Sequence, residues 1–271
     1  MSERDARAIR TWFAAYVREY TSGDADVRRN LLLKESHTRR VCREALAIGK
    51  ALGLSAPDLR IVEVIVLLHD VGRFEQYARY RTFADSRSEN HAKLTLKILR
   101  RRRVLERFHP RTREIIRRAI LYHNLPAVPP VRESRIRFFA RILRDADKLD
   151  IWKLVINYYY APEGRKNHAI SIGLPDTPDI NPLVYEDLLT GRIVNSKHMR
   201  NLNDFKLLQL GWVLDVNFVP TLKAVRRRRY LEKIRGVLPA SAQVDEVCNI
   251  VRQFMERRIS EGEPPDYAAA D

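Results

Sequence analysis

The chain has 271 residues, of which 45% are hydrophobic and 31% are charged. This composition is typical of a folded globular protein and excludes collagen-like, low-complexity and wholly disordered classes, and the length allows one or two domains. Lys and Arg total 50 and Asp and Glu total 34, so the net charge of +16 favours anionic partners such as phosphorylated small molecules, nucleic acid or an anionic membrane surface.

The sequence gives no sign of membrane insertion or export. No apolar run reaches the ~18–20 residues that a transmembrane helix needs, and the first ten residues, MSERDARAIR, contain no apolar secretory core. The two cysteines, Cys42 and Cys248, are too few for a disulfide framework. We therefore expect a cytoplasmic protein in a reducing compartment, without a membrane partner.

The hydrophobic pattern predicts an all-α protein. Apolar residues recur at three- and four-residue spacing, and period-two alternation is not evident. Ser55 is suited to cap the third helix, with Pro57 in its first turn, and Gly72 stands where a glycine cap would end it. The expected helices cover residues 4–21, 36–53, 57–71, 88–106, 111–124, 133–158, 181–190, 203–216, 217–234 and 241–259.

A stretch rich in proline and glycine, residues 162–182, is typical of a long loop. We expect it to separate a catalytic helical bundle, residues 1–160, from a C-terminal helical extension, residues 161–271, that packs on the first part.

Six ionisable residues stand on apolar helical stripes, where hydrophobic side chains belong. They are His37, His69, Asp70, His91, His123 and Asp147. Burial of such groups without partners costs several kcal/mol each, and a divalent transition metal is an economical shared partner for imidazole and carboxylate. Intervals of 21 to 32 residues between successive candidates match a helix plus a loop, so antiparallel helices could return them to one point. The alternative is that each histidine is a satisfied core residue and that Asp147 pairs with a buried Arg or Lys.

The segments LLHDVGRF and ILRDADKLD, together with His37, resemble the HD-domain superfamily of metal-dependent phosphohydrolases. The additional His91 and His123 extend the pattern to H…HD…H…H…D, similar to the HD proteins with a two-metal centre. By position, the resemblance implies that His37, His69, Asp70 and Asp147 hold a first metal. His91 and His123 would hold a second, with Asp70 bridging, or would contact substrate phosphate or the attacking water if only one ion binds. The resemblance covers about residues 30–155 and implies an HD helical bundle with additional helices after it.

The implied function is hydrolysis of a phosphate ester, in a nucleotide or another small phosphorylated substrate, by metal-activated hydroxide. One or two ions of Fe, Mn, Ni, Co or Zn would lower the pKa of bound water from ~15.7 toward ~7, with Asp70 central to the site. Arg73 could hold phosphate through a bidentate contact or form only a surface salt bridge. Lys148 could reach the substrate or a neighbouring group, and His123 could donate a proton if it is not a ligand.

Two departures narrow the resemblance. Arg73 stands where HD-GYP-type cyclic-dinucleotide phosphodiesterases have a lysine, and arginine is a poor proton donor. A GYP-like signature is also absent from its expected place in the sequence. These differences argue against cleavage of a cyclic dinucleotide.

Two other functions compete with hydrolysis. The same six residues could hold two irons and activate oxygen, as in inositol-oxygenase-type HD enzymes. The chain could instead bind nucleic acid, because residues 97–118 carry ten Lys and Arg against two Glu, and Arg226–Arg229 form a second basic run. Solvated helix faces would give the same basic pattern.

Overall fold

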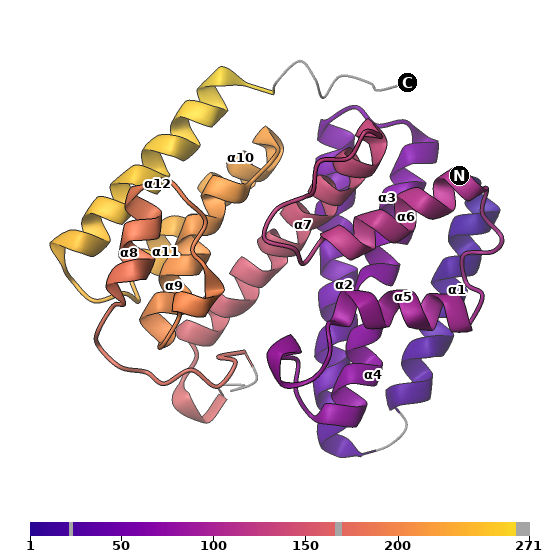
Figure 1. Ribbon diagram of the computed structural model, residues 1–271, viewed down its shortest axis with the longest axis horizontal. Coiled ribbons are helices and arrows are strands. Elements are labelled where there is room, and N and C mark those ends of the chain that lie inside the picture. Colours follow the sequence, from indigo (N-terminus) through magenta and orange to yellow (C-terminus); the bar gives the residue numbers. More distant parts are fainter. Residues whose placement is uncertain (22–23, 166–169, 264–271) are drawn as a thin grey trace. The chain divides into compact units, whose positions relative to one another are not determined.

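The computed structural model describes residues 1–21, 24–165 and 170–263, and the regular elements in these ranges are all helical (Figure 1). The expected all-α class is confirmed. The α-helices are α1 (Glu3–Thr21), α2 (Ala25–Ala51), α3 (Ala56–His69), α4 (Val71–Tyr80), α5 (His91–Arg101), α6 (Pro110–Tyr122), α7 (Ser134–Tyr159), α8 (Pro182–Leu189), α9 (Leu202–Gly211), α10 (Val219–Arg227), α11 (Tyr230–Arg235) and α12 (Ala242–Glu261). Short 3-10 helices lie at η1 (Asp85–Arg87), η2 (Glu163–Arg165), η3 (Ser196–His198) and η4 (Trp212–Asp215).

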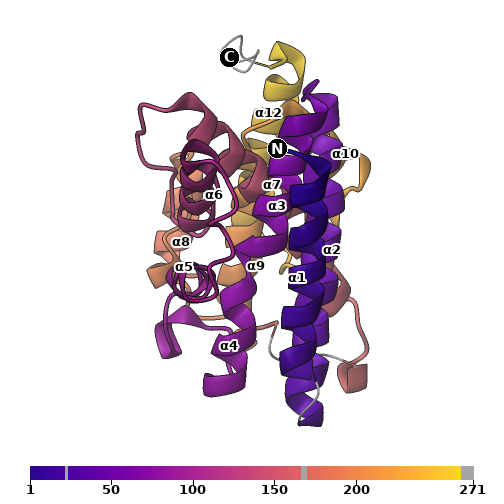
Figure 2. The ribbon, with the colours of Figure 1, turned by 90° about the vertical axis from the view of Figure 1, so that its right-hand side faces the viewer.

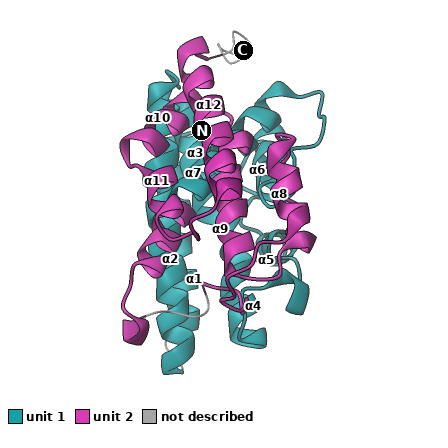
Figure 3. Cartoon of the chain, turned by 90° about the vertical axis from the view of Figure 1, so that its left-hand side faces the viewer, with its two compact units in different colours: residues 1–150, 268–271 teal, residues 151–267 magenta. Residues whose placement is uncertain are grey.

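The chain divides into two compact units (Figure 3). Unit 1 comprises the described residues up to 150, and unit 2 comprises the described residues from 151 to 263. The division falls inside α7, ten residues before the boundary expected at residue 160. The reason is aromatic packing, because Trp152 donates its indole N–H to the carbonyl of Gln209 at 2.8 Å and its ring lies 5.8 Å from that of Trp212. The loop expected over residues 162–182 falls partly on residues 166–169, outside the described residues.

The centre of unit 1 is α3, which runs beside α1 and α2 (Figure 2). Its residues from Val64 to His69 are all buried, so α3 is apolar nearly all round and needs neighbours on several faces. The expected cap is confirmed: Ser55 accepts a hydrogen bond from the backbone N–H of Asp58, and Pro57 lies in the first turn. Helix α5 lies across the long helices (Figure 1).

Helix α2 begins 11 residues earlier than the sequence pattern predicts. Asp24 caps it by accepting from the backbone N–H of Val27 at 2.9 Å. Val27 and Leu31 are buried, but the charged residues among them obscure the apolar stripe. The additional turns extend the rod on which His37 stands.

The expected helix over residues 57–71 is wrong at its end, because the chain breaks at Asp70 (φ −106°, ψ 16°) and a separate helix, α4, follows. Gly72 is therefore not a helix cap. A Cβ atom on Gly72 would lie 2.4 Å from the carbonyl oxygen of His91 and 2.7 Å from the backbone nitrogen of Thr95. The glycine allows the start of α5 to pack directly on α4, which places His91 beside Asp70.

Unit 2 consists of the end of α7 and helices α8 to α12. Two of its predicted helices are divided: residues 203–216 end in the 3-10 helix η4, and residues 217–234 break at Arg229, whose φ is +55°. Its core includes the fully buried Trp152, Phe218 and Leu222. None of the described helices combines the length and apolarity needed to cross a membrane.

Candidate metal centre

Unit 1 brings the six predicted ligand side chains to one place. They are His37 within α2, His69 and Asp70 at the α3–α4 junction, His91 at the start of α5, His123 directly after α6 and Asp147 within α7. Nitrogen and oxygen atoms of these residues form three overlapping groups, each with its ligand atoms within 4.8 Å of one another. The six side chains, some at helix ends and some within helices, therefore come from five different helices and meet around a common centre.

The first half of the cluster lies between α2, α3 and α7. The Nε2 atom of His37 is 3.1 Å from Oδ1 of Asp147 and 3.8 Å from Oδ2 of Asp70. The Nε2 atom of His69 is 3.7 Å from the same Asp70 oxygen. Two imidazole nitrogens and two carboxylate oxygens thus surround one point.

The second half lies between α3, α5 and α6. The Nε2 atom of His91 is 3.6 Å from Oδ1 of Asp70 and 3.1 Å from Nε2 of His123. Asp70 consequently presents one oxygen to each half of the cluster. This is the arrangement expected of a carboxylate shared between two binding points.

In all four histidines the other ring nitrogen, Nδ1, is already engaged. In His69 and His123 it lies 2.6 Å from the carbonyl oxygens of Val66 and Ile120, three residues earlier in the same helix. These carbonyls belong to last turns, where helix carbonyls lack the usual partners. Because a carbonyl can only accept, Nδ1 must donate, and each Nε2 of the neutral ring is left with a bare lone pair.

Carboxylates perform the same task for the other two histidines. Nδ1 of His37 lies 2.7 Å from Oδ2 of Asp150, and Nδ1 of His91 lies 2.7 Å from Oδ2 of Asp85. Arg40 holds Asp150 with two contacts, at 2.6 and 3.0 Å. Carboxylates behind ligand histidines orient the ring and increase its basicity.

The electrostatics of the cluster favour a cation. Burial lowers the pKa of His69, of His91 and of His123, in the last case to about 3, so these rings are neutral at pH 7. Burial opposes ionisation of Asp70, but the charges of Lys34 and Arg73 hold its pKa well below the ordinary value. The neutral Nε2 atoms of His91 and His123 therefore face each other at 3.1 Å beside an ionised carboxylate.

Several inward atoms are poorly satisfied. Nε2 of His69 is buried and makes no hydrogen bond, and the buried Nε2 of His37 and Oδ1 of Asp147 have only each other, at 3.1 Å. Such groups cost about 1–3 kcal/mol each when unsatisfied, and a divalent cation satisfies all of them because its ligands are bare imidazole nitrogens and carboxylate oxygens. The residues present fit a metal. Asp147 is the most exposed of the six side chains, at 20%, so the cluster is reachable from its side.

The predicted accessory residues differ in their positions. Arg73 is held by Oδ1 of Asp85 at 2.9 Å and by the carbonyl of Phe83, with its Nη2 3.5 Å from Nε2 of His91. The salt bridge considered for it does form, with Asp85, but the Arg73 side chain is only 15% exposed, so the ion pair is enclosed at the edge of the cluster and does not lie at the surface. Lys148 is buried on α7, one residue after Asp147. Contact of either residue with substrate stays a prediction.

Sequence reasoning missed three residues that touch the ligands. Lys34 places Nζ 2.9 Å from Oδ2 of Asp70, and Asp150 and Asp85 support two histidines. Lys34 precedes His37 by three residues, and Asp150 follows Asp147 by three, so the helical spacing could have indicated both. Asp85 lies in the 3-10 helix η1, between elements, where no periodic signal exists.

The comparisons with known proteins agree with this geometry over one part of the chain. The family model described as HD domain matches residues 35–152. Searches of curated proteins and of solved structures found no match. The matched segment begins just before His37 and ends just after Asp147, so it contains the six ligand side chains. Residues 35–152 are therefore identified as an HD domain.

Proposed function

We propose that this protein is a metal-dependent phosphohydrolase that cleaves a phosphate ester in a nucleotide or another small phosphorylated substrate. The observation that carries the proposal is the shared carboxylate. Asp70 has Oδ2 toward His37 and His69 and Oδ1 toward His91. The HD-domain match supports the same reaction class, because this superfamily consists largely of metal-dependent phosphohydrolases.

Two divalent ions are the occupancy that the proposal assigns to the cluster. His37, His69, Asp70 and Asp147 would hold the first, and Asp70, His91 and His123 the second. A bound pair would supply a water of lowered pKa and would offset charge on the phosphate oxygens. The protein supplies four imidazole nitrogen donors and two ionised carboxylates, and the groups behind the imidazoles hold them in place.

The remaining roles follow from the positions of the side chains. Arg73, held by Asp85 with Nη2 toward His91, is placed to bind a phosphate oxygen at the edge of the cluster. His123 is assigned to metal binding. Its Nδ1 hydrogen donates to Ile120 and its lowered pKa of about 3 leaves no proton on Nε2 at pH 7. Lys148 remains a candidate for substrate contact.

Elemental analysis of the freshly purified protein, with metal counted per chain, tests the proposal first. We expect about two transition-metal ions per chain in the wild type and in Glu63→Gln. This control alters a carboxylate that pairs with Arg10 at 2.8 Å, away from the cluster. Asp70→Asn keeps the shape of the side chain and removes its charge, so we expect it to lose both ions. Wild-type protein that binds no metal when supplied with Mn, Co, Ni or Fe would overturn the proposal.

A release assay then tests the reaction itself. Nucleotides and sugar phosphates are offered in the presence of Mn, Ni or Co, and inorganic phosphate is measured, while oxygen uptake is recorded with Fe. Phosphate release that requires metal and is absent in Asp70→Asn supports hydrolysis. Iron-dependent oxygen uptake without phosphate release would assign the same donor set to the oxygenase class instead.

A further inference from the structure

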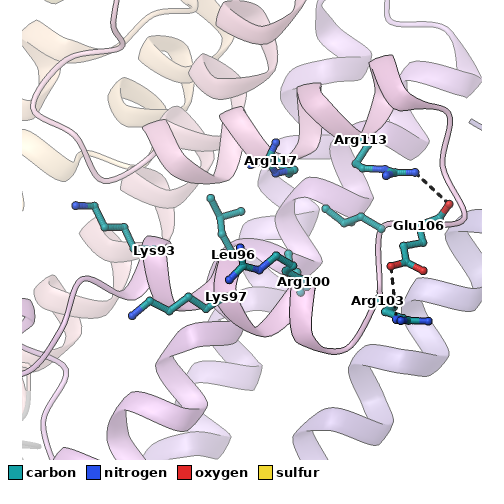
Figure 4. Close-up of a pocket in the computed structure, with 10 residues that line it drawn as sticks. Lys93, Leu96, Lys97, Arg100, Arg103, Glu106, Arg113 and Arg117 are labelled. Atoms are coloured by element: carbon teal, nitrogen blue, oxygen red, sulfur yellow. Dashed lines mark hydrogen bonds and ion pairs between the residues drawn. The ribbon is translucent and has the colours of Figure 1, made fainter.

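Unit 1 also has a hollow that lies between α5 and α6 and shares no residue with the metal cluster (Figure 4). Its volume is about 470 Å³, within the range of roughly 300–1,000 Å³ that is usual for small-molecule sites. The lining residues are Lys93, Leu96, Lys97, Leu99, Arg100, Arg103, Leu105, Glu106, Arg113 and Arg117. We call this hollow the α5–α6 pocket.

The α5–α6 pocket is strongly basic. Six of its lining residues are Lys or Arg and one is acidic. Lys93, Lys97 and Arg100 are spaced by four and three residues on one face of α5, and Arg113 and Arg117 are spaced by four on α6. Like charges at these spacings repel one another and destabilise a helix. Two such helical faces opposed across a hollow are stabilised when an anion lies between them.

The protein's own carboxylates neutralise only part of this charge. Lys97 pairs with Glu89 at 2.9 Å, and Arg117 pairs with Glu114 at 2.8 Å. Arg103 lies 3.8 Å from Glu106. These three cations have acidic partners, and each of the partners is itself partly exposed.

The other three cations have no ion pair with a carboxylate among the described residues. Lys93 and Arg100 are exposed on α5. Arg113 donates from Nη2 to the carbonyls of Glu106 and Phe108, both at 3.3 Å, and its Nε is buried without an acceptor. Arg113 is thus fixed by backbone contacts that leave its full positive charge available, with one donor still unused.

We propose that the α5–α6 pocket binds a small molecule that carries two or more phosphate groups. Guanidinium and ammonium groups recognise phosphate through charge-assisted hydrogen bonds, and the unpaired cations come from both walls of one concave site. The buried Leu99 and Leu105 contribute apolar surface to the lining. A nucleic-acid strand would instead require cations that follow an extended backbone, whereas these cations line one hollow of limited volume.

Isothermal titration calorimetry of the whole chain with inorganic tripolyphosphate tests the proposal. The buffer contains EDTA, so no metal can bind phosphate at the cluster. It also contains salt at about 150 mM, where charges more than ~8 Å apart are screened. We expect saturable binding of one tripolyphosphate per chain. This result does not depend on the proposed function, because it requires neither metal nor turnover. The Asp70→Asn variant should bind equally well.

Matched variants identify the site. Lys93→Gln with Arg100→Gln should weaken binding about tenfold or more, as loss of charge-assisted hydrogen bonds predicts. Both side chains are exposed, so folding should be retained, which the melting temperature checks. Arg4→Gln with Arg7→Gln removes the same charge from exposed positions on α1 and should leave binding unchanged. Equal weakening in both double variants, or no saturable binding in the wild type, would overturn the proposal. Binding of a 20-nucleotide RNA or DNA without binding of tripolyphosphate would also overturn it.

Discussion

Both units contain buried aspartates beside histidines or backbone amides, yet they use these residues differently. In unit 2, Asp204 is fully buried and accepts from the backbone N–H groups of Asn181 and Arg200, both at 2.8 Å. Asp187 likewise accepts from the backbone N–H of Asn195 at 3.1 Å and lies 3.0 Å from Nδ1 of His198. Local loop groups therefore satisfy these carboxylates.

In unit 1 the supporting carboxylates contact only one of the two ring nitrogens of each histidine. Asp85 and Asp150 bind the Nδ1 atoms of His91 and His37. The Nε2 atoms point into the cluster, where Nη2 of Arg73 lies 3.5 Å from that of His91 and Oδ1 of Asp147 lies 3.1 Å from that of His37. The difference shows that burial of a charged side chain is a poor indication of function by itself. The informative feature is a group of poorly satisfied atoms that face one another, because folding alone would not favour such an arrangement.

The largest effect that separates the two units is expected from Asp70→Ala. Removal of the carboxylate shared by both halves should abolish metal binding and reduce turnover to background, because each half loses a charged ligand and the second half keeps only two histidines. Metal analysis and the phosphate-release assay measure both quantities. Wild-type turnover by an Asp70→Ala protein that contains no metal would refute the metal-dependent mechanism.

Asp204→Ala should have the opposite signature. It leaves the buried backbone N–H of Asn181 and the part-buried N–H of Arg200 without their acceptor. The buried group costs about 1–3 kcal/mol, so the free energy of unfolding of unit 2 should fall by about that amount. Metal content should stay at the wild-type value. Urea denaturation, followed by the fluorescence of the buried Trp152, measures the change. A variant as stable as the wild type would show that the loop contacts do not support unit 2.

Asp85→Ala sharpens the comparison because Asp187→Ala is its matched control. Loss of the carboxylate behind His91 should weaken metal binding about 10–100-fold, as is usual for groups that orient a ligand histidine. Loss of the carboxylate behind His198 should leave metal affinity unchanged. Competition with a metal-binding dye gives both affinities. An equal loss in both variants would mean that Asp85 acts through stability and not through His91.

Chelation should produce the smallest effect. Metal at about ten times its Kd stabilises the folded state by about 1.4 kcal/mol, so EDTA should lower the melting temperature of the wild type by roughly 3–6 °C. The Asp70→Ala protein should melt at the same temperature with or without EDTA. Differential scanning calorimetry makes the comparison, and an equal shift in both proteins would place the metal effect outside the cluster.

The sequence predicted which residues cluster better than it predicted the helices that hold them. Polar residues on apolar stripes and the HD pair were enough to find the six residues, because ligand chemistry restricts residue types and helical periodicity restricts directions. Helix α4 and the early start of α2 were missed, since charged residues interrupt their stripes. The role of Gly72 was misassigned because a close approach between α4 and α5 leaves no local signal.

By itself, the sequence determined that this protein is all-α, that it is strongly basic and that six ionisable side chains lie on faces meant for burial. These properties follow from composition and period, which are local. The tertiary structure alone decided that Asp70 has one oxygen toward each half of the cluster and that Asp85 and Asp150 stand behind two histidines. It also decided that the cations of α5 and α6 surround one pocket. Such relations join residues far apart in the chain, and helix packing, not local propensity, sets them.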